Sequence, residues 1–189
     1  TMVPITVLRM VPIQRYRQYM QVFSSCCISF RIFAGNRQSG NKKYRIMDIT
    51  LLTEDKDPMG SAVYDYFKQG KAARLRVFSS QFEEDEIPVK DLFRSYEEMP
   101  LLEQKALQLA EGKILDVGAG SGCHTLALRK MGKEALAIDI SPWSVKVMEA
   151  RGLTARQVNL FDERFTERFD TILMLMNGSG IIGRLERMG

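Results

Sequence analysis

A glycine-rich turn between an apolar run and a helix is the feature that most constrains the fold of this chain. The run from Lys113 to Val117 is short and apolar, as in a buried strand, and it leads into Asp116-Val117-Gly118-Ala119-Gly120-Ser121-Gly122. A helix is expected next, from about Cys123 to Met131, where Gly132 ends it. A strand, a tight glycine turn and a helix in direct succession predict the first strand-to-helix unit of a parallel sheet.

The same alternation continues downstream. Ala135 to Ile140 forms a second apolar run, and Ser141-Pro142 opens a helix that Gly152 ends. Two further strands are expected, from Ala155 to Leu160 and from Asp170 to Met176. Strands and helices in this order predict an α/β, doubly wound fold with a mostly parallel sheet and right-handed crossovers.

Residues 47–112 are expected to form a mainly helical leader or lid ahead of this fold. Alternation from Leu75 to about Ser79 indicates a strand within it. The acidic run from Glu83 to Glu86 is expected to be a solvated loop, with a site for a cationic substrate as the alternative. Helices are expected at Ser61 to Gln69, Asp91 to Glu98 and Pro100 to Ala110.

The charges set residues 1–46 apart from the rest. This segment holds eight Lys or Arg residues and no Asp or Glu, whereas the remainder carries 19 basic and 23 acidic side chains. One interpretation is a basic arm for nucleic acid, an anionic surface or organelle import. The interpretation that we favour makes Met47 the natural start, so that residues 1–46 are disordered or not native to the protein.

Neither a membrane span nor a disulfide framework is expected. The run from Val22 to Phe30 is interrupted by serines and is too short to cross a bilayer. Three cysteines, of which Cys26 and Cys27 are adjacent, do not make a disulfide framework. The sequence shows no metal-ligand cluster with useful spacing. These features favour a soluble protein of the reducing cytoplasm.

Two carboxylates accompany the glycine turn. Asp139 ends the second strand, 21 residues after Gly118, where a carboxylate can accept two hydrogen bonds from a ribose diol. A nicotinamide dinucleotide site is the obvious rival, but its fingerprint has glycine or alanine where this chain has Cys123. That fingerprint also has no need of Asp116, which suits a cofactor with an α-ammonium group.

With these residues in place, the stretches ILDVGAGSGCH, AIDIS and FDTILML resemble the class I (Rossmann-like) S-adenosylmethionine-dependent methyltransferases. The first motif of that family is an acidic residue followed by GxGxG. The resemblance covers about residues 113–189, and DPMGSAVYDYF and DLFRSYEEMPLLEQKAL also resemble the leader of a bacterial subgroup of small methyltransferases. It implies S-adenosyl-L-methionine as the cofactor and methyl transfer to an acceptor, which we expect to be a small molecule.

The resemblance also implies a set of cofactor-binding residues. Gly118 to Gly122 and Asp116 would support the methionine part, Asp139 the ribose hydroxyls and Ile140 the adenine. Where the family often has Asp to accept the adenine amino group, this chain has Asn159, whose amide oxygen can accept the same bond. The expected set is Asp116, Gly118, Ala119, Gly120, Gly122, His124, Asp139, Ile140, Asn159, Leu160 and Asn177.

Simpler roles are open to several of these residues. Asp116 could cap backbone amides of the glycine turn, and Asp139 could be a helix-capping neighbour of Ser141. For His124 and Cys123 we favour packing or hydrogen bonding beside the cofactor over a role as base or nucleophile. Two questions stay open: whether Trp143 borders the adenine, and whether the leader closes over the cofactor through Phe93, Arg94 and Tyr96.

The sequence contains fewer signals for the end of the site that would bind the methyl acceptor. Enzymes that methylate exocyclic amines of DNA bases show Asp or Asn, two prolines and an aromatic after the fourth strand, whereas this chain has an open glycine-containing loop around Asn177. A nucleic-acid acceptor is therefore disfavoured, and no catalytic base is assigned. Since 13 residues follow Met176, we expect a fold truncated after its fourth strand. The alternatives to an enzyme of small molecules are a non-catalytic cofactor-binding fragment that assembles through its open sheet edge, and a nucleic-acid methyltransferase using the basic arm.

Overall fold

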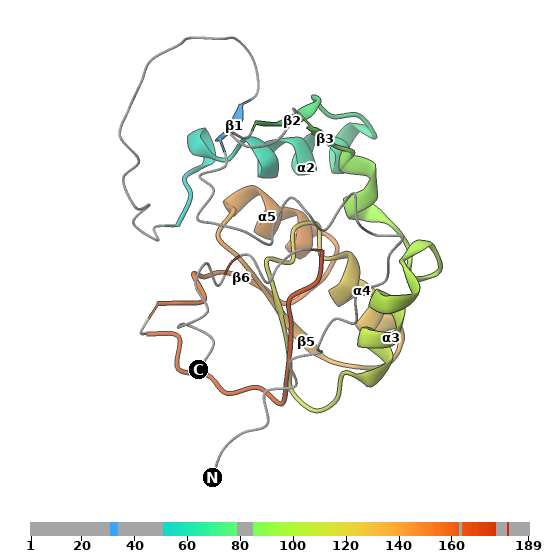
Figure 1. Cartoon of the computed structure of the whole chain (residues 1–189). Coiled ribbons are helices and arrows are strands. Elements are labelled where there is room, and N and C mark those ends of the chain that lie inside the picture. Colours follow the sequence, from blue (N-terminus) through green and yellow to red (C-terminus); the bar gives the residue numbers. More distant parts are fainter. Residues whose placement is uncertain (1–30, 34–50, 79–84, 163, 177–180, 182–189) are drawn as a thin grey trace.

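The computed structural model describes residues 31–33, 51–78, 85–162, 164–176 and 181 (Figure 1). In this part of the chain a four-stranded parallel sheet carries helices on one face. Helix α2 (Pro58–Gln69) lies beside helix α5 (Pro142–Ala150), and a smaller antiparallel sheet lies on the other side of α2, as Figure 1 shows.

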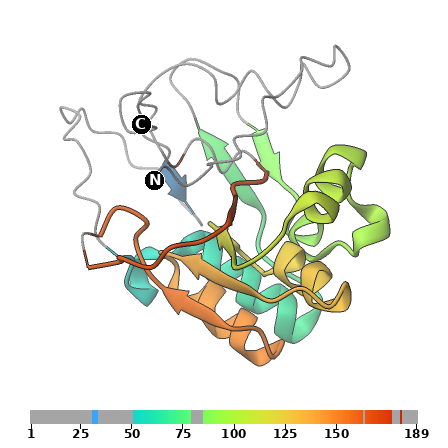
Figure 2. The same cartoon turned by 90° about the horizontal axis from the view of Figure 1, so that it is seen from below.

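The parallel sheet has the strand order β6-β5-β4-β7 (Figure 2). Strand β4 (Ile114–Val117) is central and pairs in parallel with β5 (Ala135–Asp139) on one side and β7 (Thr171–Leu173) on the other. Strand β6 (Ala155–Gln157) pairs in parallel with β5. The chain thus reverses its direction of travel across the sheet at β4, which confirms the doubly wound fold. Ligands in such sheets bind at the carboxyl ends of the strands near this reversal.

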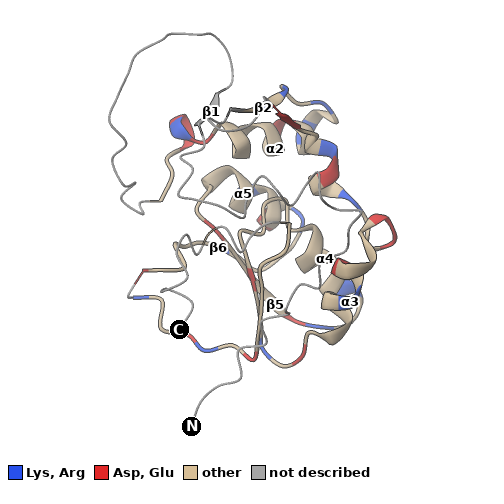
Figure 3. Ribbon diagram, viewed as in Figure 1, with Lys and Arg blue, Asp and Glu red and all other residues tan. Residues whose placement is uncertain are grey.

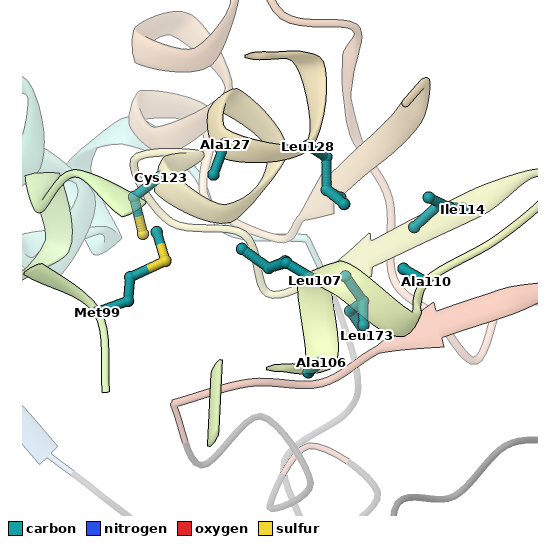
Figure 4. Close-up of a cluster of buried hydrophobic side chains, with 9 residues drawn as sticks. All are labelled: Met99, Ala106, Leu107, Ala110, Ile114, Cys123, Ala127, Leu128 and Leu173. Carbon is teal, nitrogen blue, oxygen red and sulfur yellow. The ribbon is translucent and has the colours of Figure 1, made fainter. Parts of the chain in front are cut away.

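Three helices cover one face of the sheet because alternate strand residues point toward them. Ile114 of β4 packs in one cluster with α3 (Leu101–Leu109) and α4 (Cys123–Lys130), shown in Figure 4. Ala137 of β5 packs with Val145 and Met148 of α5. On the opposite face, alternate β4 and β5 residues pack with the segment between β6 and β7; this cluster consists of Leu115, Val117, Leu136, Ile138 and Phe169.

The leader packs on the sheet domain where its helix α2 contacts helix α5. Ala62 and Val63 of α2 share a buried cluster with Val147 of α5 and Leu92 of the leader. Besides α2 the leader holds β2 (Leu75–Phe78), β3 (Asp85–Ile87) and the 3-10 helices η2 (Glu54–Lys56), η3 (Val89–Phe93) and η4 (Tyr96–Glu98). Strand β2 pairs antiparallel with β3 and with β1 (Arg31–Phe33).

Three expectations for the first half of the chain were wrong. Asp91 to Glu98 is not one helix, because Arg94 and Ser95 have extended backbones and Ser95 starts a new capping box with Glu98. Asp85 and Glu86 belong to a strand rather than a loop, although both side chains are exposed. Residues 31–33 form β1, within the segment for which no regular structure was expected.

The remaining expected elements agree with the sequence analysis, apart from strand ends and the start of α2, which begins at Pro58 rather than at Ser61. Strands β6 and β7 end at Gln157 and Leu173, three residues earlier than expected, because the chain turns after each of them. No helix in the described residues is long and apolar enough to cross a membrane. Asn177, Cys26 and Cys27 lie outside the described residues.

Candidate cofactor-binding site

The glycine turn between β4 and α4 has a backbone that requires glycine. Gly118, Gly120 and Gly122 have φ angles of 67°, 56° and 77°, in the left-handed region that other residues rarely adopt. The amides of Gly118 and Ala119 donate to the carbonyl of Ile138 on β5, at 2.9 and 3.2 Å. A Cβ placed on Gly120 would meet no heavy atom within 4 Å, so the backbone at this position faces open space.

Asp139 joins this turn to the next one. Its Oδ2 accepts a hydrogen bond from the amide of Gly120 and its Oδ1 one from the amide of Ser141, both at 2.9 Å. Burial raises the pKa of the carboxyl, while these backbone donors lower it. The contact with Ser141 matches the simpler role considered for Asp139. A carboxylate has about four lone-pair sites, so the amides of Gly120, Ser141 and Ile140 that lower its pKa leave acceptor capacity for a ligand.

Asp116 lies behind the glycine turn, 2% exposed, on the helix-covered face of β4. Its Oδ2 accepts a hydrogen bond of 2.6 Å from the hydroxyl of Thr125 on α4. Burial raises the pKa of Asp116, whereas His124 and Thr125 lower it. The carboxylate therefore ties the start of α4 to the end of β4 and fixes the two ends of the turn relative to each other.

His124 is buried beside Asp116 and takes part in an ion-pair network. Its Nε2 lies 2.9 Å from Oε2 of Glu103 on α3, and the same oxygen accepts from the guanidinium of Arg94. Burial lowers the pKa of His124, but Cys123, Glu103 and Asp116 raise it to about 10. A pKa of about 10 favours the protonated form of His124 near neutral pH, and its role beside the cofactor stays a prediction.

The leader reaches the glycine turn through Ser121. The Ser121 hydroxyl donates to the carbonyl of Leu92, and Arg151 at the end of α5 donates to the Ser121 carbonyl at 2.6 Å. The Arg151 guanidinium also lies over the ring of Phe93, 5.4 Å from its centroid. Phe93 and Arg94 thus contact groups around the glycine turn, while the Tyr96 hydroxyl accepts from Gln108. Closure of these three residues over a cofactor stays a prediction.

The residues expected near the adenine differ in their exposure and in the groups that they contact. Ile140 is 40% exposed at the end of β5, whereas Asn159 is buried and its Oδ1 accepts from the amide of Phe161 at 2.9 Å. Leu160 packs with the cluster on the opposite face of the sheet. The Trp143 indole donates to the carbonyl of Glu54 at 3.2 Å, so it contacts the leader. Adenine contacts of Ile140, Asn159 and Leu160 stay predictions.

Four residues of this region were not found from the sequence: Asp57, Glu103, Arg151 and Ile181. The Ile181 side chain lies in front of the first turn glycine, since its Cδ1 would be 2.7 Å from a Cβ on Gly118. Glu103 reaches His124 across 21 residues, a contact that leaves no spacing signal in the sequence. The contacts of Asp57 and Arg151 depend on packing between distant segments.

Comparison with known proteins agrees with this geometry. Residues 115–176 match the family model of a methyltransferase domain. The chain is similar to a crystal structure of an S-adenosylmethionine-dependent methyltransferase from Bacteroides fragilis in complex with S-adenosyl-L-homocysteine. The two are 70% identical with a TM-score of 0.70, over 74% of this chain and 58% of that one.

A curated relative is an uncharacterized methyltransferase of Staphylococcus carnosus (strain TM300), 38% identical over 85 residues. That match covers 44% of this chain and 40% of the relative, so the chain spans less than two thirds of either protein. The residues matched by the family model include β4 from Leu115 onward, the glycine turn, Asp139 and β7. Residues 115–176 are therefore similar to a methyltransferase domain, and the chain resembles a solved S-adenosylmethionine-dependent methyltransferase over part of its length.

Proposed function

We propose that this chain binds S-adenosyl-L-methionine and acts as a methyltransferase on a small-molecule acceptor. The observation that carries the proposal is the pair formed by Gly120 and Asp139. The backbone of Gly120 faces open space, and its amide holds a carboxylate that keeps acceptor capacity at the same edge of the sheet. The B. fragilis structure, described as a complex with S-adenosyl-L-homocysteine, supports the choice of ligand.

We assign each residue to a part of the cofactor according to its chemistry. Asp139 would accept the ribose hydroxyls, the exposed side chain of Ile140 would lie against the adenine, and Gly118 to Gly122 would approach the methionine part. Ala119, His124 and Asp116 would support that turn from behind, and Asn159, Leu160 and Asn177 would complete the site. The cofactor supplies an activated methyl carbon, so the protein has mainly to align the acceptor with it and exclude water.

A small-molecule acceptor is favoured over a nucleic acid by two observations. The sequence after β7 lacks the proline-rich pattern of enzymes that methylate DNA bases. Basic and acidic residues are interspersed along the described elements (Figure 3), so the ribbon shows no stripe of one charge along a helix. We further propose a cytoplasmic protein, which suits the free thiol of Cys123.

Calorimetric titration of the full chain with S-adenosyl-L-homocysteine tests the binding step. We expect a saturable heat for one site, weakened about ten- to a hundredfold in Asp139→Asn, because the amide presents donors where the carboxylate accepted. The exposed Asp55→Asn is the matched control and should bind as the unmodified chain does. No saturable heat from a chain shown to be folded by circular dichroism would contradict the proposal.

Methyl transfer is tested separately with S-adenosyl-L-methionine labelled on its methyl group. The full chain is incubated with a cell extract that has been separated into low-molecular-weight, nucleic-acid and protein fractions. We expect the label in the low-molecular-weight fraction. Label in the nucleic-acid fraction would reassign the acceptor, and binding without label in any fraction would indicate a non-catalytic cofactor-binding module.

A further inference from the structure

Asp57 is a buried carboxylate at the point where two helices begin. It is 2% exposed, and its Oδ1 accepts from the amide of Gly60, which caps α2. Its Oδ2 accepts from the hydroxyl of Ser141 at 2.5 Å and from the amide of Trp143 at 3.4 Å, both at the start of α5. Because helix N-termini favour negative charge, the α2 and α5 termini both stabilise the Asp57 carboxylate.

A single residue, Ser141, connects Asp57 to Asp139 through hydrogen bonds. The Ser141 hydroxyl donates to Asp57 and accepts from the amide of Ser144 at 2.9 Å, while the Ser141 amide donates to Asp139. The hydroxyl bonds fix the side-chain rotamer and the backbone of Ser141 together. The direction of the Ser141 amide, and with it the position of the Asp139 carboxylate, therefore depends on Asp57.

Two further contacts hold the same turn from the leader side. The amide of Leu52 donates to the carbonyl of Ile140 at 3.1 Å. The Gln157 side chain donates to the carbonyl of Leu52 at 2.8 Å and to that of Ile140 at 3.0 Å. The approach is tight, since a Cβ on Gly60 would lie 2.1 Å from Oδ2 of Asp57 and 2.2 Å from Oγ of Ser141. Residues 52–60 therefore pack directly on residues 140–143.

We propose that Asp57 is a positioning residue of the cofactor site, which acts through Ser141 to hold Asp139 where it receives the ribose hydroxyls. The inference rests on the proposed binding of the cofactor and adds a leader residue to that site. It also explains why Ser141 donates its hydroxyl proton to another segment, since capping α5 needs only its acceptor function.

The test compares Asp57→Asn, Ser141→Ala, the double variant and the exposed control Asp55→Asn by titration with S-adenosyl-L-homocysteine. Each single change at position 57 or 141 should weaken binding about tenfold, and the double variant should be no weaker than the weaker single variant. Additive effects, or an Asp57→Asn variant that binds like Asp55→Asn, would show that Asp57 does not act on the cofactor site through Ser141.

The pH dependence of binding separates positioning from a merely structural role. Asp139 faces the amides of Ile140 and Ser141 from its own strand and turn, the amide of Gly120 from the glycine turn and the carboxylate of Asp57 from the leader. Burial is the largest cause that raises the Asp139 pKa, and the charge of Asp57 raises it further. Loss of affinity on acidification should therefore occur at lower pH in Asp57→Asn than in the unmodified chain.

The outcomes separate this inference from the proposed function. If the unmodified chain binds and Asp57→Asn binds equally well with the same pH midpoint, the inference fails and the cofactor site stands. If the folded unmodified chain does not bind, both fail. If Asp57→Asn does not fold, Ser141→Ala decides the matter, because an unchanged affinity and midpoint in that variant would overturn the inference.

Discussion

The two strand-to-helix turns at the candidate site are held in place by different means. The turn after β4 consists largely of glycines in left-handed conformations, so it has few side chains with which to stabilise itself. The turn after β5 has Ser141-Pro142, and Ser141 caps α5 through the amide of Ser144. The second turn therefore needs one outside carboxylate, Asp57, whereas the first depends on several groups around it.

Those groups form a row of alternating charges from the leader to the sheet. Arg94 contacts Glu103, and Glu103 contacts His124. The charge of His124 in turn lowers the pKa of Asp116. In a buried setting each charge depends on its neighbour, because removing one leaves another uncompensated. The glycine turn, which is open to a ligand, is thus supported from behind by charged residues of α3, α4 and β4 and by Arg94 of the leader.

The largest effect should come from breaking this row at its centre. In Glu103→Gln, Arg94 and His124 lose their shared carboxylate, and we expect the free energy of unfolding to fall by about 3–5 kcal/mol. The exposed Glu149→Gln on α5 is the matched control and should change it by less than about 0.5 kcal/mol. Urea unfolding followed by the fluorescence of the only tryptophan, Trp143, measures both. Equal values for the two variants would refute the contrast between the turns.

Local signals were sufficient to predict the turns themselves from the sequence. Apolar runs, glycines and the Ser141-Pro142 pair predicted β4, β5, α4 and α5 to within about one residue at each end. The location of Asp139 beside the glycine turn followed from the parallel sheet, since the ends of adjacent strands meet.

The supports of the turns could not be predicted in this way. Glu103 reaches His124 across 21 residues, and Asp57 reaches Ser141 across 84 residues, so neither contact leaves a periodic or spacing signal. The segment from Asp91 to Glu98 shows the opposite error, because a helix-like composition was overridden by the extended backbone at Arg94 and Ser95. That extended backbone separates η3, whose Leu92 contacts Ser121, from η4 and α3.

The pH dependence of the free energy of unfolding tests whether His124 carries a charge in the row behind the glycine turn. Its pKa is about 10 in the folded chain and 6.5 as the ordinary value, so its contribution is fully present below pH 6.5 and is lost as the pH rises toward 10. Between these values the unfolded chain binds fewer protons, and stability should fall by up to about 1.4 kcal/mol per pH unit. His124→Gln, compared with the unmodified chain at each pH, isolates this term. A stability difference between the two that is independent of pH would show that His124 is not a charged member of the row.

Alanine at two of the turn glycines gives the smallest and most local test. In Gly122→Ala the new Cβ would lie 2.5 Å from Cδ1 of Leu153 and 2.9 Å from Cγ of Met148, so strain and crowding add and the cost should be about 2–3 kcal/mol. In Gly120→Ala the Cβ meets no heavy atom within 4 Å, and backbone strain alone should cost about 1–2 kcal/mol. Binding of S-adenosyl-L-homocysteine should show the reverse order of loss, because the methyl group at position 120 enters the space in which the ligand would lie. If Gly120→Ala retained full affinity, the ligand would not approach the turn at Gly120, and the rigidity supplied by Glu103 and Asp116 would serve the fold rather than the site.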